Sequence, residues 1–218
     1  STPDKKFSDD YQSGALSFEI IRNNKKLICN SGYFQNYKHQ LNNISKTTAC
    51  HSTLSIANHS SVQFVKQPDS PSKISTGLKI FNKKIISENN YWSASASHDG
   101  YNKRFGIIHE RKIDFLHDAE KFIGVDKIFK KKKFKSVNFE IRFHLDPESK
   151  IMKTQDGKAI YIDLNNEGWK FICKEYKIDV ETGLFFGLKN NFTENQNIVI
   201  LGMVQNEKQK ISWELEKI

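Results

Sequence analysis

Apolar and polar residues alternate with a period of two along most of the chain. The clearest case is the segment SVNFEIRFHLDP, residues 136–147, whose odd-numbered positions are apolar from Phe139 to Leu145. Successive side chains of a strand point to opposite faces, so this pattern predicts a strand with one buried face. The opposite face carries Arg142 and His144, which we expect on a solvated outer surface.

Turn signals separate these strand-like segments every 8–12 residues or so. Asp99-Gly100 is a strong turn signal, and it lies between two apolar-rich stretches of residues 91–116. Further hairpins are expected at 52–65 around Asn58, at 158–174, and at 196–218. Convincing helical periodicity is absent. The pattern predicts an all-β protein: an antiparallel, layered (supersandwich-like) β-sandwich of many short strands with little helix.

A chain of 218 residues is long enough for one large β domain with its own core. Residues 1–12 are polar, and we expect them to form a loosely ordered N-terminal segment or the edge of a fragment. A single sandwich domain is expected over residues 13–218. Nothing approaches an unbroken apolar run of about 18 residues, so no transmembrane segment is expected. No signal peptide is visible at the start.

The charge is strongly positive, with 34 Lys and Arg against 25 Asp and Glu, a net charge of +9. Only four of the basic residues are Arg, the side chain on which base recognition and phosphate binding depend most. We therefore expect no nucleic-acid partner. A positive field attracts an anionic polysaccharide as well as it attracts DNA. The densest basic run, residues 127–136, is expected to be a solvated turn.

The three cysteines, Cys29, Cys50 and Cys173, show no CxxC spacing and no zinc-ribbon pattern. Buried, inert thiols are the expected state of all three. Cys50 stands next to His51, but neighbouring residues of a strand point to opposite faces, which disfavours a Cys–His nucleophilic pair.

Seven short motifs follow one another in a specific order: SGALSFEI, LICNSGY, TTACHSTLSI, SASHDGYNKRFGIIHERKI, IRFHLDPE, WKF and ISWELEKI. In this order they resemble the C-terminal β-sandwich of heparinase II/III-like polysaccharide lyases, from about Ser13 to the C-terminus. The resemblance implies a bacterial enzyme of two parts. An N-terminal α/α toroid carries most of the catalytic residues, including a Tyr, and the sandwich contributes a His to the cleft. Only the sandwich is matched here, so the toroid is the missing partner.

The resemblance implies β-elimination on a polysaccharide that contains uronic acid, such as a glycosaminoglycan. Such a reaction needs a group that disperses the carboxylate charge, a base for the C5 proton and an acid for the leaving oxygen. His51, in the motif ACHST, matches the sandwich histidine and is the expected catalytic residue, held open at the rim of the cleft. The structural alternative is a His51 bonded to Ser52, Thr53 or Thr48 in a polar turn.

The turn at Asp99-Gly100 supplies further candidates for substrate binding. His98, Tyr101 and Arg104 surround it and could grip sugar and carboxylate groups, or serve only as turn residues and an aromatic lid. His109 and Arg111 share one face of the following strand and are added to the expected binding set. That face also carries Ile107 and Ile113, so a half-buried His109 with a purely structural role is the alternative.

No cofactor is expected, and the site is assigned no metal. Some relatives hold a metal in the sandwich, so a structural zinc or calcium ion is the alternative, with His98, Asp99 and His109 as its nearest ligands. The spacing of these three residues does not enforce convergence. The family's metal-binding His, two residues beyond the catalytic one, is Thr53 here.

The sequence thus predicts the sandwich part of a polysaccharide lyase, inactive without its toroid and acting on an acidic polysaccharide. The first alternative is a non-catalytic carbohydrate-binding module, with Tyr101, Tyr91 and Trp92 as a sugar platform. The second is a binder of nucleic acid or membrane surfaces, which the scarcity of Arg disfavours. The resemblance suggests a periplasmic or extracellular protein, while the residues themselves do not fix the compartment.

Overall fold

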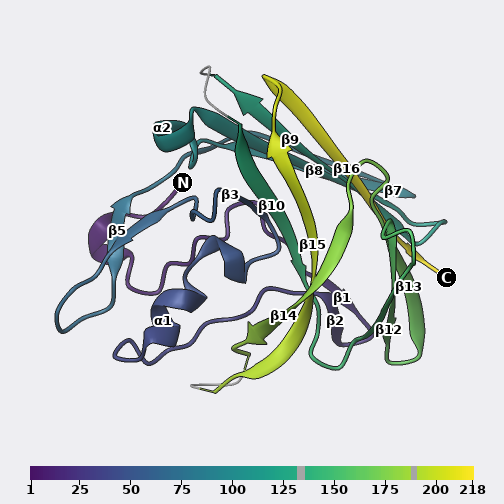
Figure 1. The fold of residues 1–218 in the computed structure, drawn as a ribbon, viewed down its shortest axis with the longest axis horizontal. Helices are drawn as coiled ribbons and strands as arrows, with labels where there is room; N and C mark the ends of the chain where they lie inside the picture. Colours follow the sequence, from purple (N-terminus) through teal and green to yellow (C-terminus); the bar gives the residue numbers. More distant parts are fainter. Residues whose placement is uncertain (132–135, 188–190) are drawn as a thin grey trace.

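The chain forms two main β-sheets in a computed structural model that describes residues 1–131, 136–187 and 191–218 (Figure 1). Part of the Lys-rich run at 127–136 lies outside these described residues. The larger sheet has eight strands. In order across the sheet they are β11 (Lys150–Lys153), β12 (Ala159–Leu164), β13 (Glu167–Ile172), β16 (Lys208–Lys217), β9 (Lys121–Lys130), β8 (Ile107–Leu116), β7 (Tyr91–His98) and β6 (Ile80–Glu88).

The smaller sheet has four strands in the order β14 (Ile178–Phe185), β15 (Thr193–Val204), β10 (Val137–His144) and β3 (Leu54–Ile56). It lies across the larger sheet (Figure 1), and aromatic rings from both meet between them. The ring centroid of Phe143 on β10 is 4.8 Å from that of Trp213 on β16 and 4.8 Å from that of Phe171 on β13. The predicted all-β sandwich of antiparallel sheets is confirmed.

β10 has the predicted alternation, with Phe139, Ile141 and Phe143 in the core. Its opposite face is less open than expected. His144 is buried, because the segment that carries Ser31 and Ala49 covers that side of β10. A third, irregular layer therefore lies outside the smaller sheet. It includes α1 (Gln40–Ser45) and the 3-10 turn η2 (Thr48–Cys50).

Two predicted hairpins are confirmed. β7 and β8 pair across the Asp99-Gly100 turn, with α2 (Asn102–Phe105) in the connection, and β12 pairs with β13. Asn165 and Asn166 adopt positive φ angles of 56° and 61° between β12 and β13, as a tight hairpin turn requires.

Two other predicted hairpins are wrong, because each pair of strands divides between sheets. β3 joins the smaller sheet, while β4 (Gln63–Val65) pairs with β5 (Lys73–Thr76) in a small separate sheet. β15 belongs to the smaller sheet and β16 to the larger one, so the turn between them carries the chain across the sandwich. The segment around Leu16 is a turn with φ of 58°, and only β1 (Ile20–Arg22) is extended there, paired with β2 (Lys25–Ile28).

Residues 1–12 make hydrogen bonds to the rest of the sandwich. Their only regular element is η1 (Lys5–Phe7). Thr2 N–H donates to Leu78 O at 3.1 Å, and the Ser8 hydroxyl accepts from Ile74 N–H at 3.1 Å. The fully buried Lys46 reaches the carbonyl oxygens of Asp9 and Ser72. Among the described residues, the structure has no helix that is both long and apolar enough to cross a membrane.

Candidate functional site

His51 directly follows the η2 turn, and its backbone N–H closes that turn on Thr48 O at 3.0 Å. The ring Nδ1 lies 2.8 Å from the carbonyl oxygen of Thr47. A carbonyl only accepts, so Nδ1 carries the proton and Nε2 keeps its lone pair. Gln12 Oε1 lies 3.3 Å from Nε2 and caps it; because Nε2 only accepts in this tautomer, the hydrogen bond requires the Gln12 amide to be turned so that its NH2 group donates to Nε2. The fold thus fixes one tautomer of His51 and turns its basic nitrogen toward the N-terminal segment.

Residues 12–14, the cover of His51, close the ring off from solvent. His51 is only 4% exposed, and a Cβ atom added to Gly14 would lie 2.5 Å from the ring Cδ2. The expected open position at a cleft rim is therefore wrong for this structure, while the catalytic role stays a prediction. Burial lowers the pKa of His51 more than the hydrogen bond to Thr47 raises it, so the ring is neutral at pH 7.

Three hydroxyl groups hold the cover in place. Ser13 Oγ lies 2.9 Å from Thr48 Oγ1 and 2.9 Å from Ser61 Oγ, and all three residues are buried. The hydroxyl of Ser13 also accepts from Val62 N–H at 2.9 Å. The main chain next to Gln12 is therefore pinned, whereas the half-buried Gln12 side chain makes its hydrogen bond to His51 from the partly exposed side.

A groove lined by polar side chains together with Val62 and Phe64 lies beside His51. Two adjoining hollows of about 440 and 280 Å³ share Thr47, Asn58, His59 and Ser60, and we call them together the Asn58 groove. Its other lining residues include Asn43, Ala49, Ser55, Gln63, Lys66, Ser72, Glu140 and Arg142. Thr47, whose carbonyl holds the ring of His51, lines both hollows, so the groove and His51 share one structural element.

Sequence reasoning gave the groove residues no role. His59 lies in both hollows, its ring against Phe105 with the centroids 5.4 Å apart. Arg142 lines one hollow but is paired with Glu140 and Glu181. The one usable signal was the dense polar run from Asn58 to Gln63. The other walls come from segments far apart in the chain.

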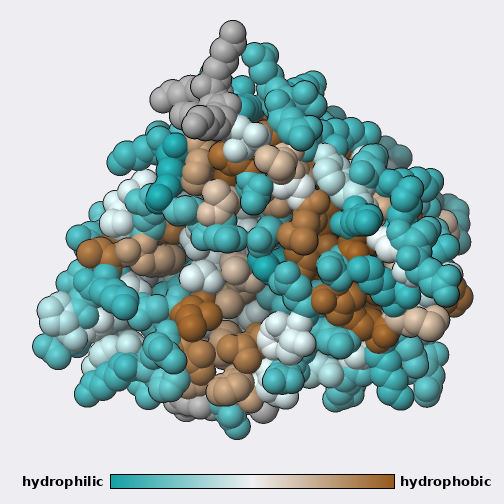
Figure 2. Space-filling model, viewed as in Figure 1, coloured by the Kyte–Doolittle hydropathy of each residue, from teal (hydrophilic) through white to brown (hydrophobic). Residues whose placement is uncertain are grey.

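Part of the groove lies on the outer face of the smaller sheet, where Ser55 of β3 and Glu140 and Arg142 of β10 line one hollow. Figure 2 shows hydrophilic side chains over much of this side of the molecule, broken by apolar patches, some over the strands of the smaller sheet and others to the left of and below them. Leu201 and Met203 of β15 are each 44% exposed there. Sugar hydroxyls need hydrogen-bonding partners, and the amides and hydroxyls that line the groove can supply them, which makes the groove a candidate carbohydrate surface.

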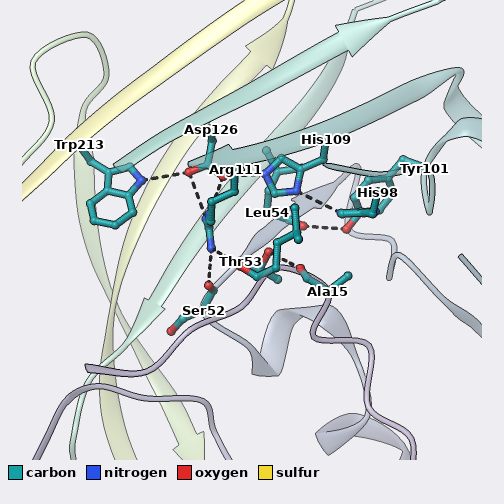
Figure 3. A network of polar contacts seen from close by, with 11 residues as sticks. Ala15, Ser52, Thr53, Leu54, His98, Tyr101, His109, Arg111, Asp126 and Trp213 are labelled. Carbon is teal, nitrogen blue, oxygen red and sulfur yellow. Dashed lines mark hydrogen bonds and ion pairs between the residues drawn. The ribbon is translucent and has the colours of Figure 1, made fainter. Parts of the chain in front are cut away.

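A second cluster of polar side chains lies inside the sandwich, centred on Asp126 of β9 (Figure 3). Arg111 grips the carboxylate with two nitrogens, Nε to Oδ1 at 2.8 Å and Nη2 to Oδ2 at 3.1 Å. His109 Nε2 donates to Oδ1 at 2.6 Å, and Trp213 Nε1 donates to Oδ2 at 3.0 Å. Arg111 and Asp126 face each other in the β8–β9 register, which sets up the pair. We call these four side chains the Asp126 cluster.

The hydrogen bonds of the Asp126 cluster fix the tautomers of two histidines. Because His109 Nε2 donates to the carboxylate, its Nδ1 accepts from His98 Nε2 at 3.1 Å. His98 Nδ1 in turn accepts from the N–H of Gly100 at 3.1 Å. All four ring nitrogens therefore have a protein partner.

The charges of the Asp126 cluster follow from burial and from Arg111. Burial alone would raise the pKa of Asp126, but the charge of Arg111 and the hydrogen bond from His109 outweigh it and hold that pKa well below its usual range. Burial lowers the pKa of His109 despite Asp126, and burial together with His109 lowers that of His98 further. Both rings are neutral at pH 7, and the cluster carries one negative and one positive charge.

The structure corrects four of the five expected substrate-binding residues. His98, Tyr101, His109 and Arg111 are 0%, 1%, 0% and 3% exposed, so a polysaccharide on the surface cannot reach them here. The Tyr101 hydroxyl donates to Leu54 O at 2.8 Å, a structural bond that also removes Tyr101 from any sugar platform. Arg104 alone lies on the surface, its guanidinium 5.7 Å from the ring centroid of Phe105, and its binding role stays a prediction.

These residues do not fit a metal ion. All ring nitrogens of His98 and His109 are hydrogen-bonded to other protein groups, and Asp99 Oδ1 accepts from Lys79 N–H at 2.7 Å. Thr53 donates its hydroxyl to Ala15 O at 2.8 Å. Across the described ranges, no three His, Cys, Asp or Glu side chains are grouped so that they could hold a metal. The three cysteines are buried and free, as expected.

Solved structures with this fold are longer proteins. The heparan sulfate lyase HepC from Pedobacter heparinus aligns with a TM-score of 0.76 at 16% identity, over 94% of this chain and 30% of that one. A structure of heparinase III aligns with a TM-score of 0.67 at 16% identity, over 95% of this chain and 30% of that one. At this identity the likeness shows a shared fold. The chain spans about 30% of the length of either structure.

No curated protein matches the sequence at a significant level. The family described as "Heparinase II/III-like, C-terminal" matches residues 1–214, nearly the whole chain. The sandwich architecture agrees with that match. The chain belongs to the heparinase II/III-like C-terminal family.

Proposed function

We propose that this chain is the sandwich part of a lyase that cleaves a uronic-acid-containing polysaccharide by β-elimination, and that it requires an α/α toroid for activity. The observation that carries the proposal is the state of His51. Its ring is neutral, its Nδ1 proton is fixed on Thr47 O, and its Nε2 lone pair faces one side chain, that of Gln12. Family membership supports the reaction class.

A neutral imidazole with a defined lone pair is suited to proton transfer in β-elimination. Its Nε2 can accept a proton and, once protonated, balance the negative charge that develops near the uronate carboxylate. For substrate to reach Nε2, the Gln12 side chain has to turn away, which replaces one hydrogen bond of 3.3 Å. The structure thus corresponds to a closed state of His51, and the open state requires a local side-chain movement.

The Asn58 groove is the surface proposed for the sugar chain. Its amides and hydroxyls offer donors and acceptors for sugar hydroxyls, and the exposed Lys66 adds a positive charge for an acidic group. The net charge of +9 draws acidic polymers toward the chain. The relatives of known structure include a heparan sulfate lyase, so a sulfated glycosaminoglycan is the first substrate to test.

The reaction is tested in the full-length protein that contains this chain joined to its toroid. Heparan sulfate, alginate and pectin are offered separately, and the ultraviolet absorbance of the unsaturated product is followed. We expect His51→Ala to lower kcat by about 100-fold or more, and His117→Ala, which changes an exposed histidine outside the groove, to leave kcat unchanged. Full activity of the His51→Ala enzyme, or robust cleavage by the isolated sandwich, would contradict the proposal.

The closed state of His51 also favours a second candidate, a carbohydrate-binding module without chemistry. In this case the Asn58 groove binds sugar and His51 only supports Thr47. Asn58→Ala would then weaken polysaccharide binding by the isolated chain, while the full-length protein would show no product with any substrate. Product that depends on His51 rejects this candidate.

A further inference from the structure

Arg111 is a buried cation of the sandwich core, and its guanidinium makes four hydrogen bonds to oxygen acceptors. Besides the two oxygens of Asp126, its Nη1 donates to Ser52 O at 2.7 Å and to Leu16 O at 3.0 Å. The rings of Phe18 and Phe143 flank the guanidinium at 5.5 and 6.0 Å. One side chain therefore gathers a carboxylate and two carbonyl oxygens from three separate segments, a set of oxygen donors that a bound metal ion also attracts.

We propose that Arg111 acts as a built-in cation: it neutralises Asp126 and ties the Leu16 and Ser52 segments to the larger sheet, so that this sandwich needs no metal ion. The donor set supports this, because the guanidinium already occupies the carboxylate and His98 and His109 have no free ring nitrogen. The hydroxyl of Thr53 is likewise engaged, since it donates to Ala15 O. Binding a divalent ion here would require displacing Arg111 from Asp126.

The same guanidinium controls both sides of the His51 enclosure. Ser52 is the residue after His51, and Leu16 lies two residues beyond Gly14, which packs on the ring. The loop that carries His51 and the cover that closes it therefore share one anchor on β8. Arg111 does not contact His51, so it is a positioning residue. Its metal-replacing role stands independently of the lyase proposal.

The first experiment uses the native chain and measures metal content and thermal unfolding. We expect less than about 0.1 metal ion per chain by elemental analysis, since a structural site would be filled close to one-to-one. We expect the Tm to be the same in EDTA, in zinc and in calcium. A metal ion bound one-to-one, together with a Tm that falls in EDTA, would overturn the proposal even if every Arg111 variant failed to fold.

The second experiment replaces the cation. Arg111→Lys keeps the charge, but a single ammonium nitrogen cannot span the carboxylate and both carbonyls, so we expect the Tm to fall by about 10 °C. Arg142→Lys is the matched control, because Arg142 is likewise paired with acidic side chains, those of Glu140 and Glu181, but lies near the surface. We expect its Tm to change by less than about 3 °C. Equal Tm values for Arg111→Lys and the native chain would overturn the proposal.

The third experiment separates neutralisation from packing. Arg111→Met leaves Asp126 buried without its cation, whereas Arg111→Met with Asp126→Asn removes both charges. We expect the double variant to melt at least about 5 °C higher than Arg111→Met alone. A double variant that melts at the same temperature as the single one, or lower, would contradict a charge-neutralising role.

The positioning role is read from the His51 ring by NMR in the folded Arg111→Lys chain. The ring signals of His51 should shift and its pKa should move up toward the ordinary value, because the loop and its cover separate. The exposed His117 serves as the internal reference and should not move. Unchanged His51 signals in a destabilised Arg111→Lys variant would show that Arg111 contributes packing alone, and the positioning role would be rejected.

Discussion

His51 and the Asp126 cluster are two buried polar regions of the same sandwich, built in opposite ways. In the Asp126 cluster every polar side chain is matched by side chains of the large sheet or by neighbouring main chain, deep between the sheets. His51 has one firm partner, Thr47 O, and one weaker partner on the half-buried Gln12. Low exposure alone therefore does not separate a structural histidine from one that a small movement can open to solvent.

The largest effect is expected from Asp126→Ala. It leaves Arg111 buried without a counter-charge, and an uncompensated buried ion costs about 3–5 kcal/mol of unfolding free energy. Urea unfolding measures the loss. The exposed Asp163 on β12 of the same sheet is the control, and Asp163→Ala should cost less than about 0.5 kcal/mol. A loss below about 1 kcal/mol for Asp126→Ala would mean that the cluster is not a sealed ion pair.

Acid should destabilise the fold through its buried neutral histidines. Burial lowers the pKa of His144 to about 3, and the pKa values of His98, His109 and His51 are lowered as well. Below about pH 6.5 these histidines are protonated in the unfolded chain but stay neutral in the folded chain, so the free energy of unfolding falls as the pH falls. Each such histidine contributes a slope of up to about 1.4 kcal/mol per pH unit. Urea midpoints between pH 7 and 4 measure the total slope.

His144→Gln isolates one contribution to the acid sensitivity. Removing this titrating group should flatten the stability profile between pH 6.5 and 3, whatever the variant's stability at pH 7. His117→Gln, at an exposed turn, should leave the slope unchanged. If His144→Gln keeps the full slope, His144 is protonated at the same pH in the folded and the unfolded chain.

One glycine packs against an aromatic ring in each region, Gly124 against Trp213 and Gly14 against His51, so Gly→Ala can be compared between the two. A Cβ at Gly124 would lie 2.0 Å from two carbon atoms of the Trp213 indole, inside the core. A Cβ at Gly14 would lie 2.5 Å from His51 Cδ2, under the cover. We expect Gly124→Ala to cost about 1–3 kcal/mol, because the core cannot shift without strain. Gly14→Ala should cost less than about 1 kcal/mol, because the clash is with one histidine ring, which can shift toward the movable Gln12 side chain without displacing the pinned main chain.

Denaturant unfolding measures the loss of unfolding free energy in both glycine variants. Chemical labelling of His51 measures how accessible its ring becomes to solvent. Gly14→Ala should expose the ring, whereas Gly124→Ala should leave it closed. Equal costs for the two variants would mean that the cover over His51 is as rigid as the core, and the proposed local opening would then be rejected.

The smallest change in stability is expected from Gln12→Ala. Loss of one partly exposed hydrogen bond should cost less than about 1 kcal/mol. The same change uncovers Nε2, so carbethoxylation of His51 by diethyl pyrocarbonate should speed up several-fold relative to His117 in the same sample, as measured by mass spectrometry. Gln63→Ala, at an exposed glutamine, is the control. An unaltered labelling rate at His51 would show that Gln12 is not the gate.

The sandwich could be predicted because its signals are local. The alternation in β10 and the paired asparagines between β12 and β13 are each contained in one short segment. The turn between β15 and β16 is as polar as a hairpin turn, and nothing nearby shows that the two strands lie in different sheets. Local sequence patterns predict where strands lie along the chain, but they do not predict which sheet each strand joins.

The candidate site depended on distant partners. The shared face of His109 and Arg111 was predicted. Their common acceptor, Asp126, lies on another strand, where the sequence shows only one polar residue among apolar ones. Gln12 covers His51 from 39 positions earlier in the chain, which no local pattern reveals. A charged residue among apolar neighbours on the buried face of a predicted strand was the one available warning of an internal ion pair.

β6, the last strand of the eight-stranded sheet, has a consequence for solubility. Its pairing with β7 is irregular between Phe81 and Lys84, and Asn82 has a positive φ of 52°. An outer strand invites a neighbouring molecule to extend the sheet, and the exposed Ile85 makes such stacking attractive. The bulge and the adjacent Lys83 and Lys84 oppose it, because they bend the free edge and place like charges along it. This protein therefore carries its own protection against growing into fibres from that edge.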